Sequence, residues 1–136
     1  MFEITEDNIQ IDQLLHHVGK SANGAIVTFV GIIREMSRGH KVLYLEYQAY
    51  QEMAILKMRQ IGEEIREKWA GVDVAIVHRV GHLEVGDCSV VIAVASSERK
   101  VPFEACEYAI NRLKEIVPIW KKEVWEDGEA WIGDRS

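Results

Sequence analysis

Lysines gather near the C-terminal end of a chain that is acidic elsewhere. Lys114 lies four residues before Pro118, and Lys121 and Lys122 follow that proline beside Trp120. Ammonium groups held close together bind phosphate or carboxylate. Their mutual repulsion and burial lower a lysine pKa, so that the amine can transfer protons near neutral pH. These residues therefore predict an anion pocket that is also capable of acid–base chemistry.

Pro118 determines how the two ends of this region are positioned. A helix over residues 102–117 must end just before it, because the residue that precedes a proline is pushed out of helical geometry. A strand then runs over residues 119–125. Lys114, in the last helical turn, can meet Lys121 across the turn.

The period of two along that strand separates the neighbouring lysines. It places Lys121 and Glu123 on one face and Lys122 on the other. A purely structural interpretation stays open. In that interpretation Lys114 interacts with a helix C-terminus, and the two strand lysines are solvated edge charges.

Two arginines stand where buried strands end and loops begin. Arg34 closes a strand over residues 24–34, and Arg99 follows a strand over residues 88–96. Guanidinium groups bind phosphate and carboxylate in a bidentate manner. Arg34, Arg99, Lys114 and Lys121 therefore predict an anion cage, although an isolated arginine at a strand end is commonly just solvated.

Composition limits the class of protein. With 136 residues and 48% hydrophobic content, the chain can bury the core of one domain over residues 1–136 without disulfides or metal. The formal net charge of -6 argues against nucleic acid as a general partner, since a phosphate backbone requires a basic surface. No apolar run is long enough to span a membrane, which predicts a soluble cytoplasmic protein.

Hydrophobic periodicity predicts an α+β fold. We expect an exposed loop over residues 35–40 and a hairpin of the strands on either side of Gly86-Asp87. The apolar residues of the strand over 24–34 indicate a central strand covered on both faces. The first helix is expected to be capped by Asp7 or Asn8. The predicted helices cover residues 7–20, 50–69 and 102–117, and the predicted strands cover residues 2–5, 24–34, 42–48, 72–80, 88–96, 119–125 and 129–132.

Cysteines and histidines suggest no separate chemistry. Cys88 and Cys106 fall on apolar faces and are expected to be reduced core residues, with no Cys-x-x-Cys pair for zinc or redox chemistry. His78 and His82 flank a strand end, where a spacing of four does not form a metal site. The sequence has no phosphate-binding glycine loop and no Gly-x-Ser-x-Gly motif.

A series of motifs resembles a known family over nearly the whole chain. In this order and spacing they are similar to the catalytic large subunit of molybdopterin synthase. The motifs are Gly24-Ala25, Gly31-x-x-Arg34, Leu45-Glu46-Tyr47-Gln48-Ala49-Tyr50, His78-Arg79-Val80-Gly81, Gly86-Asp87, Ser97-x-Arg99 and Pro118-Ile119-Trp120-Lys121-Lys122-Glu123.

The resemblance implies a fold, a reaction and partners. The fold is an α+β hammerhead type, with a mainly antiparallel sheet packed by helices. The reaction is that of a sulfurtransferase, which converts cyclic pyranopterin monophosphate (precursor Z) to molybdopterin by adding two sulfurs, with no cofactor or metal. The sulfur comes from a thiocarboxylate on the C-terminal Gly-Gly of a small ubiquitin-like carrier. Two catalytic subunits form the homodimer core of a heterotetramer.

The resemblance also assigns roles to residues. Lys114 and Lys121 are implied as the catalytic lysines, for proton transfer and for neutralising developing negative charge. The substrate-binding residues it implies are Arg34, Glu98, Arg99, Lys114, Lys121, Lys122 and Glu123.

Three positions depart from the family pattern. Glu98 stands where histidine is common, Gln48 stands where glutamate is frequent, and the chain ends at Ser136, where many relatives continue. Two other functions are therefore kept open. One is a non-catalytic carrier-binding module of the same fold, and the other is a regulatory domain that senses an anionic metabolite.

Overall fold

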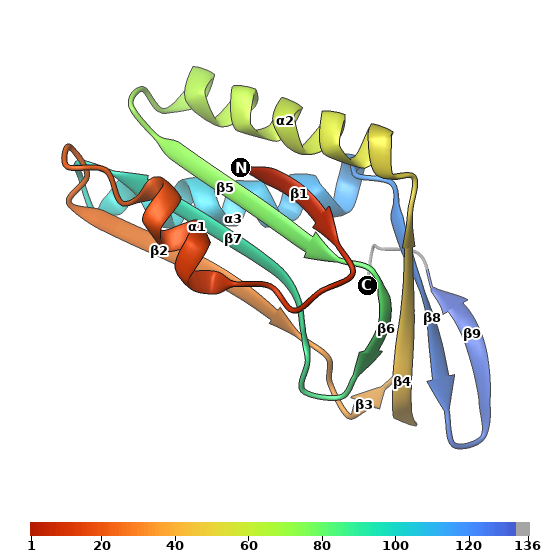
Figure 1. Cartoon of the computed structure of the whole chain (residues 1–136). Helices are drawn as coiled ribbons and strands as arrows, with labels where there is room; N and C mark the ends of the chain where they lie inside the picture. Colours follow the sequence, from red (N-terminus) through yellow and green to blue (C-terminus); the bar gives the residue numbers. More distant parts are fainter. Residues whose placement is uncertain (133–136) are drawn as a thin grey trace.

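The computed structural model describes residues 1–132 and contains two sheets and three helices over that range (Figure 1). The expected difference from the family at the chain end, Ser136, lies outside these described residues. The elements are β1 (Phe2–Thr5), α1 (Ile11–Val18), β2 (Ala25–Ile32), β3 (Met36–Ser37), β4 (His40–Ala49), α2 (Gln51–Lys68), β5 (Asp73–Arg79), β6 (Gly81–Glu84), β7 (Cys88–Ser96), α3 (Lys100–Ile116), β8 (Ile119–Trp125) and β9 (Gly128–Ile132).

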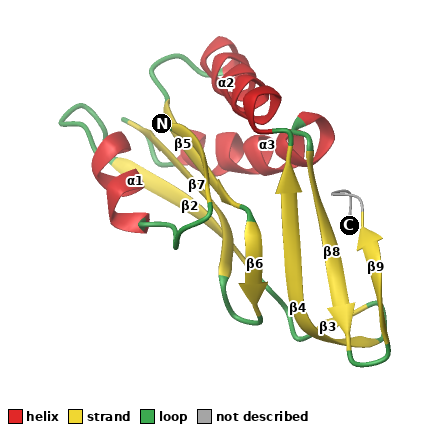
Figure 2. Ribbon diagram, turned by 45° about the vertical axis from the view of Figure 1, so that its right-hand side comes forward, coloured by secondary structure: helices red, strands yellow, loops and turns green. Residues whose placement is uncertain are grey.

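The first sheet has the strand order β1-β5-β7-β2 and forms the centre of the molecule. Only its β1–β5 pair is parallel. Helices α2 and α3 cover one face and α1 covers part of the other (Figures 1 and 2). Alternation along β7 supplies both cores, since Ile92 and Val94 pack toward α2 and α3 while Val91 and Ala93 pack toward α1.

The second sheet has the order β3-β4-β8-β9, and β6 also pairs with β4. It stands beside the first sheet, with β8 and β9 at the outer side (Figure 2). All of its strand pairs are antiparallel. The two sheets and three helices confirm the predicted α+β architecture of mainly antiparallel strands packed by helices.

The prediction that residues 24–34 form a central strand covered on both faces is wrong. Strand β2 lies at the edge of the first sheet, where it pairs with β7 alone within the described chain. Ile26, Val30 and Ile32 are 40, 37 and 59% exposed on its outer face. Helix α1 has only eight residues and packs mainly against Ala75, Val77 and their β7 neighbours, so it leaves the outer face of β2 partly uncovered.

Two connections also differ from the predicted ones. The segment after β2 contains the short strand β3 and the buried Ser37, so it is not simply an exposed loop. The antiparallel β5–β7 pair is confirmed, but its connection includes β6, which leaves the first sheet to pair with β4. Strand β6 has only four residues, and an alternation of polar and apolar side chains over so short a stretch does not predict a strand.

The first helix begins later than predicted, at Ile11. Asn8 does not cap it, because the Asn8 Oδ1 accepts a hydrogen bond from Arg79 Nη1 at 2.9 Å. The residue at the cap position is Gln10, whose side chain makes no capping hydrogen bond. The polar residues before the helix are therefore used to fix the N-terminal connection to β5.

A β-bulge changes the orientation of Cys88. Gly31 pairs with Val90 and Ile32 pairs with Cys88, which leaves Ser89 as the extra residue of β7. The predicted alternation of Cys88 with Val90 is therefore wrong, since Cys88 packs with the α1-side core. Cys106 is buried, as predicted, and burial raises its thiol pKa to about 11. Both cysteines are free.

Among residues 1–132, none of the helices has the length and apolar character that crossing a membrane requires.

Candidate active site

Lys114 and Lys121 line the same cavity, as the sequence predicts. This cavity, here called the lysine pocket, has a volume of about 360 Å³ and lies where the first sheet, α3 and the β4–β8 pair meet. Its lining residues are Phe29, Val30, Gly31, Ile32, Arg34, Tyr47, His78, Ser89, Val90, Ile110, Leu113, Lys114 and Lys121.

The turn at Pro118 brings the lysines together. Helix α3 ends at Ile116, and Val117 takes an extended conformation with φ -83° and ψ 123°. That is the conformation that a following proline imposes. The chain then returns as β8, whose Lys121 lies opposite Tyr47 of β4 in the antiparallel register. The lysine in the last turn of α3 thereby faces the lysine of the next strand.

Glu123 lies beneath Lys121 on the same face of β8. The side chain of Glu123 is 4% exposed, and its Oε2 lies 3.8 Å from the Lys121 Nζ. Ser37 Oγ donates a hydrogen bond to Oε2 at 3.0 Å, and Trp125 Nε1 donates one to Oε1 at 3.0 Å. A buried carboxylate with three such partners is anchored, so it serves as a fixed counter-ion for the lysine.

Arg34 connects the lysine pocket to this buried carboxylate. It follows β2, is exposed, and lines the pocket together with both lysines. It also lines a smaller crevice of about 50 Å³ that includes Lys121, Glu123 and Ser37. Three of the four cations of the predicted cage therefore gather in one place.

The fourth cation, Arg99, is not brought to the pocket within one chain. It stands at the N-cap of α3, fifteen residues before Lys114, which corresponds to about 22 Å along a helix. The adjacent Glu98 is also exposed at that end. The strand register agrees, because Ser96 pairs with Ala25 while Cys88 pairs with Ile32 at the other end of β2.

Lys122 lies on the opposite face of β8 from Lys121, as the period of two predicts. Its Nζ is 3.4 Å from Glu129 Oε2 and 5.7 Å from the ring centroid of Trp131. On the same face, Trp120 Nε1 donates a hydrogen bond to Gln48 Oε1 at 3.3 Å. Lys122 and Gln48 therefore belong to the outer surface of the second sheet and not to the lining of the lysine pocket.

Part of the pocket floor is a row across the first sheet. Gly31 of β2, Val90 of β7 and His78 of β5 are register partners, so they share one face. A Cβ atom at Gly31 would lie 2.7 Å from Val90 Cγ1 and 3.1 Å from Ser89 Oγ. The glycine in Gly31-x-x-Arg34 therefore leaves the space that a side chain would fill.

Sequence reasoning missed three polar residues of the lining. Ser89 reaches the pocket through the bulge, which no pattern in the sequence reveals. Tyr47 and His78 stand at inward positions of their strands, and each belongs to one of the quoted motifs, which indicated no role for either residue. Alternation along β4 and β5 could have placed both on the inner faces.

His78 is neutral in this environment. Burial lowers its pKa to about 4, and the positive charges of Lys114 and Lys121 act in the same direction. The ring packs edge-on against Tyr47, with 5.0 Å between the ring centroids. Among residues 1–132, no group of His, Cys, Asp or Glu side chains has the arrangement of a metal site. His82 instead contacts Glu84 at 2.9 Å.

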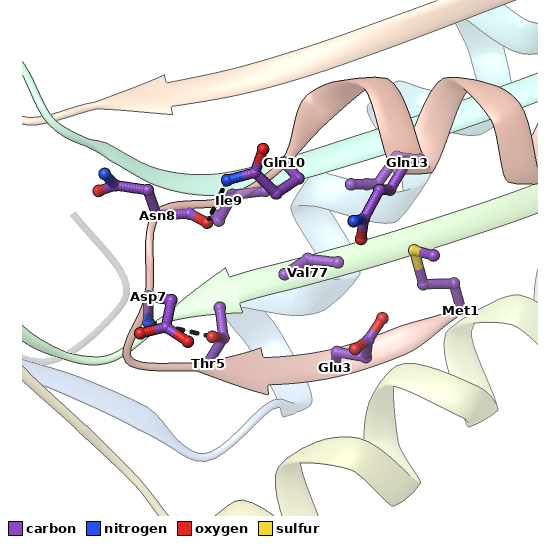
Figure 3. A pocket seen from close by; sticks show the side chains of 10 residues that line it. Met1, Glu3, Thr5, Asp7, Asn8, Ile9, Gln10, Gln13 and Val77 are labelled. Atoms are coloured by element: carbon purple, nitrogen blue, oxygen red, sulfur yellow. Dashed lines mark hydrogen bonds between the residues drawn. The ribbon is translucent and has the colours of Figure 1, made fainter.

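Another cavity, of about 260 Å³, lies between the N-terminal segment and α1 (Figure 3). Its lining includes Glu3, Thr5, Asn8, Gln13 and Val77, and Figure 3 shows Glu3 and Thr5 on β1, Val77 on β5 and Gln13 on α1. It contains none of the site residues expected from the sequence. The lysine pocket is the place where the cations converge, and it is therefore the candidate active site.

Comparison with known proteins agrees with this placement. A family model described as MoaE protein matches residues 4–116. The chain belongs to the MoaE protein family. The molybdopterin synthase catalytic subunit of Bacillus subtilis (strain 168) is 54% identical over 134 residues, which cover 98% of this chain and 85% of that protein. The resemblance inferred from the motifs is confirmed.

Solved structures show the same MoaE fold. The crystal structure of molybdopterin synthase from Staphylococcus aureus matches with a TM-score of 0.94 and 52% identity, over 97% of this chain and 96% of that one. A complex of subunits 1 and 2 of molybdopterin-converting factor from Helicobacter pylori 26695 matches with a TM-score of 0.79. That match covers 98% of this chain and 91% of the other at 22% identity, so it bears on the fold alone.

Proposed function

We propose that this protein is the catalytic subunit of a molybdopterin synthase. It converts cyclic pyranopterin monophosphate to molybdopterin with two sulfurs taken from the thiocarboxylated C-terminus of a small ubiquitin-like carrier. The observation that carries the proposal is the convergence of Lys114, Lys121 and Arg34 in one pocket. It is supported by 54% identity over 134 residues to a protein named as a catalytic subunit of this synthase.

The charge of the pocket suits the substrates of that reaction. The pyranopterin carries a phosphate, and the thiocarboxylate that donates sulfur is also an anion. Partly buried cations hold such groups more strongly than exposed ones because the local dielectric constant is lower. In each transfer a carbon–sulfur bond forms on the pterin side chain while a carbon–oxygen bond at the same carbon breaks, and the departing oxygen stays on the phosphate or leaves as water. Water then cleaves the bond between that sulfur and the carrier's acyl carbon, leaving a carrier carboxylate.

The residues divide this work by position. Lys114 and Lys121 transfer protons and neutralise negative charge that develops on the intermediate. Arg34 binds the substrate anion at the pocket mouth. Glu123 acts behind Lys121, where its anchored carboxylate fixes the direction of the ammonium group. Lys122 lies on the outer face of β8 beside Glu129 and outside the lining of the pocket.

Arg99 and Glu98 contribute to the lysine pocket of a second copy of the chain. Strand β2 has a free edge within the described residues, and Ile26, Val30 and Ile32 are exposed beside it. If two β2 strands pair in antiparallel fashion, the Ala25 end of one lies near the Ile32 end of the other. Such a homodimer brings Arg99 of each copy toward the lysines of the other, which explains its distance within one chain.

The carrier-binding module without catalysis is the second candidate, and Glu98 is the observation that favours it. A carboxylate at the position where relatives commonly have histidine places negative charge near an anionic substrate. Glu98 is exposed, however, and its charge is therefore screened by solvent. The intact lysine pair and the buried Glu123 favour catalysis.

A reconstitution tests the proposal. Purified protein, thiocarboxylated carrier and cyclic pyranopterin monophosphate are combined, and molybdopterin is scored by its fluorescent oxidation product. The proposal predicts product only when all three are present. A stable complex with the carrier but no product would support the binding module instead, and Glu98→His is then the variant that should gain activity. Binding of the pterin without any interaction with the carrier would support the regulatory domain that senses an anionic metabolite.

A further inference from the structure

His78 has a fixed hydrogen-bonding direction in the lysine pocket. Its side chain is buried, and its Nδ1 lies 2.7 Å from the carbonyl oxygen of Arg79. A carbonyl oxygen can only accept, so Nδ1 carries the hydrogen and donates it. In the neutral ring the other nitrogen, Nε2, then has no hydrogen and is an acceptor. The geometry therefore determines the tautomer as well as the orientation.

Two further contacts hold the ring in place. Tyr47 from β4 packs edge-on against it at 5.0 Å between ring centroids. On the sheet, His78 stands opposite Val90 of β7, which is itself packed in the main core. A ring held by one hydrogen bond and two packed neighbours has little freedom to turn, so its Nε2 lone pair has a constant direction.

The surroundings of the ring are positively charged. The ionisable groups that line the pocket with it are Lys114 from α3, Lys121 from β8, Tyr47 from β4 and Arg34 from the segment after β2. Burial and the two lysine charges keep the pKa of His78 at about 4, so the ring stays neutral at pH 7. It adds an acceptor to a site rich in donors without adding a negative charge. A carboxylate in its place would repel a phosphate or thiocarboxylate.

We propose that His78 is a positioning residue, whose Nε2 accepts a hydrogen bond from the ammonium group of Lys114 and so fixes the direction in which that lysine delivers its proton. Both lysines line the pocket with the ring, but Lys121 is already directed by Glu123, whose Oε2 lies 3.8 Å from its Nζ. An ammonium group has three hydrogens, and one of them is held by this bond while another can point at the substrate. The role of His78 in turnover rests on the proposed function, whereas the tautomer of its ring does not.

Nitrogen NMR of the ring tests the tautomer without any assay of activity. Uniformly ¹⁵N-labelled protein is examined from pH 5 to pH 8, and the His78 signals are identified by their loss in His78→Gln. The proposal predicts a protonated Nδ1 and an unprotonated Nε2 over the whole range. A protonated Nε2, or a ring that gains a proton near the ordinary histidine pKa of about 6.5, would overturn it. If His78→Gln fails to fold, the signals are instead assigned by through-bond correlation of the ring with the His78 backbone.

Two substitutions separate positioning from packing. The side-chain amide of His78→Gln is long enough to place an acceptor at the position of Nε2. The shorter amide of His78→Asn reaches only the position of Nδ1. We expect the Gln variant to retain kcat within about tenfold and the Asn variant to lose about 100-fold, with KM little changed in both. Loss of the acceptor destabilises the ammonium form, so the basic limb of the pH profile should move to lower pH in His78→Asn alone.

The controls distinguish the possible failures. His16 lies exposed on α1, away from the lysine pocket, and His16→Gln should react at the wild-type rate. Equal losses in His78→Gln and His78→Asn with an unchanged pH profile would show a structural role only and refute positioning. Absence of product with wild-type protein would instead refute the proposed function, and the NMR result would then decide on the tautomer by itself.

Discussion

Lys121 and Glu123 project from the same face of β8, with 3.8 Å between the Lys121 Nζ and the Glu123 Oε2. Their side chains are 12 and 4% exposed. The lysine that faces the pocket is therefore backed by a carboxylate that water hardly reaches. The alternation of a strand places one residue of the pair directly behind the other, and Ser37 and Trp125 hold the carboxylate from behind.

Glu123→Gln should reduce turnover at least about tenfold, because Lys121 loses its counter-ion while the side-chain size is preserved. The free energy of unfolding should fall by about 1–3 kcal/mol, since the hydrogen-bonded carboxylate is buried. The reconstituted reaction measures the turnover, and urea unfolding measures the free energy. Ser37→Ala is the matched control, because it removes one donor and leaves the charge. Wild-type turnover in Glu123→Gln would mean that the carboxylate has no part in positioning Lys121.

Gly31→Ala should raise KM for the pterin substrate by about tenfold, since its Cβ meets Val90 Cγ1 at 2.7 Å and fills the pocket floor. Steady-state kinetics with saturating carrier measure the change. The double variant Gly31→Ala/Val90→Ala removes the close contact and should recover part of the lost affinity. If KM is unchanged in the single variant, the row of Gly31, Val90 and His78 does not touch the substrate.

Arg99→Ala and Lys121→Ala homodimers should each be inactive but should complement each other when mixed. If Arg99 acts across the dimer, each heterodimer has one site with both residues intact. Random exchange should then restore about a quarter of the wild-type rate. The measurement is turnover after subunit exchange, with each variant alone as the baseline. No recovery despite exchange would place Arg99 in the site of its own chain, and activity of Arg99→Ala alone would place it outside any site.

Glu64 should make stability sensitive to acid. It accepts hydrogen bonds from Arg112 Nε at 2.8 Å and Tyr108 Oη at 2.6 Å, which join α2 to α3. The hydrogen bond from Arg112 is the main cause that lowers its pKa from 4.5 to about 2. Because the folded pKa is depressed, this stabilisation is complete above pH 4.5 and is lost as the pH falls toward about 2.

Urea unfolding of Glu64→Gln at a series of pH values measures this contribution. The difference in unfolding free energy between wild type and variant should shrink over that acidic range. Glu63→Gln, at the exposed neighbouring position on α2, should show no such change. A constant difference between wild type and Glu64→Gln at every pH would mean that the carboxylate is not stabilised in the folded state.

Local chemistry made part of the fold and site predictable. Pro118 and the last turn of α3 were enough to predict that Lys114 and Lys121 share a pocket. The period of two along β8 separated Lys121 from Lys122, as the structure shows. Both results depend on patterns within a few residues of one another, where backbone geometry leaves little choice.

Features that depend on distant contacts were not predictable. The apolar faces of β2 suggested a central strand because sequence cannot tell whether a partner covers an exposed face. The bulge that turns Ser89 into the pocket comes from the pairing of β2 with β7 and not from either strand alone. Arg99 was expected in the cage because helix length was not weighed against the position of the strand ends.

The reconstituted reaction with Lys121→Ala tests the central claim most directly. Lys41→Ala is the control, since Lys41 forms an exposed ion pair with Glu126 at 3.3 Å at the far end of β4. Both variants should fold and bind the carrier like wild type. Lys41→Ala should form molybdopterin at the wild-type rate, while Lys121→Ala should form none. Molybdopterin formation by Lys121→Ala at the rate of the control would contradict the assignment of the lysine pocket as the active site.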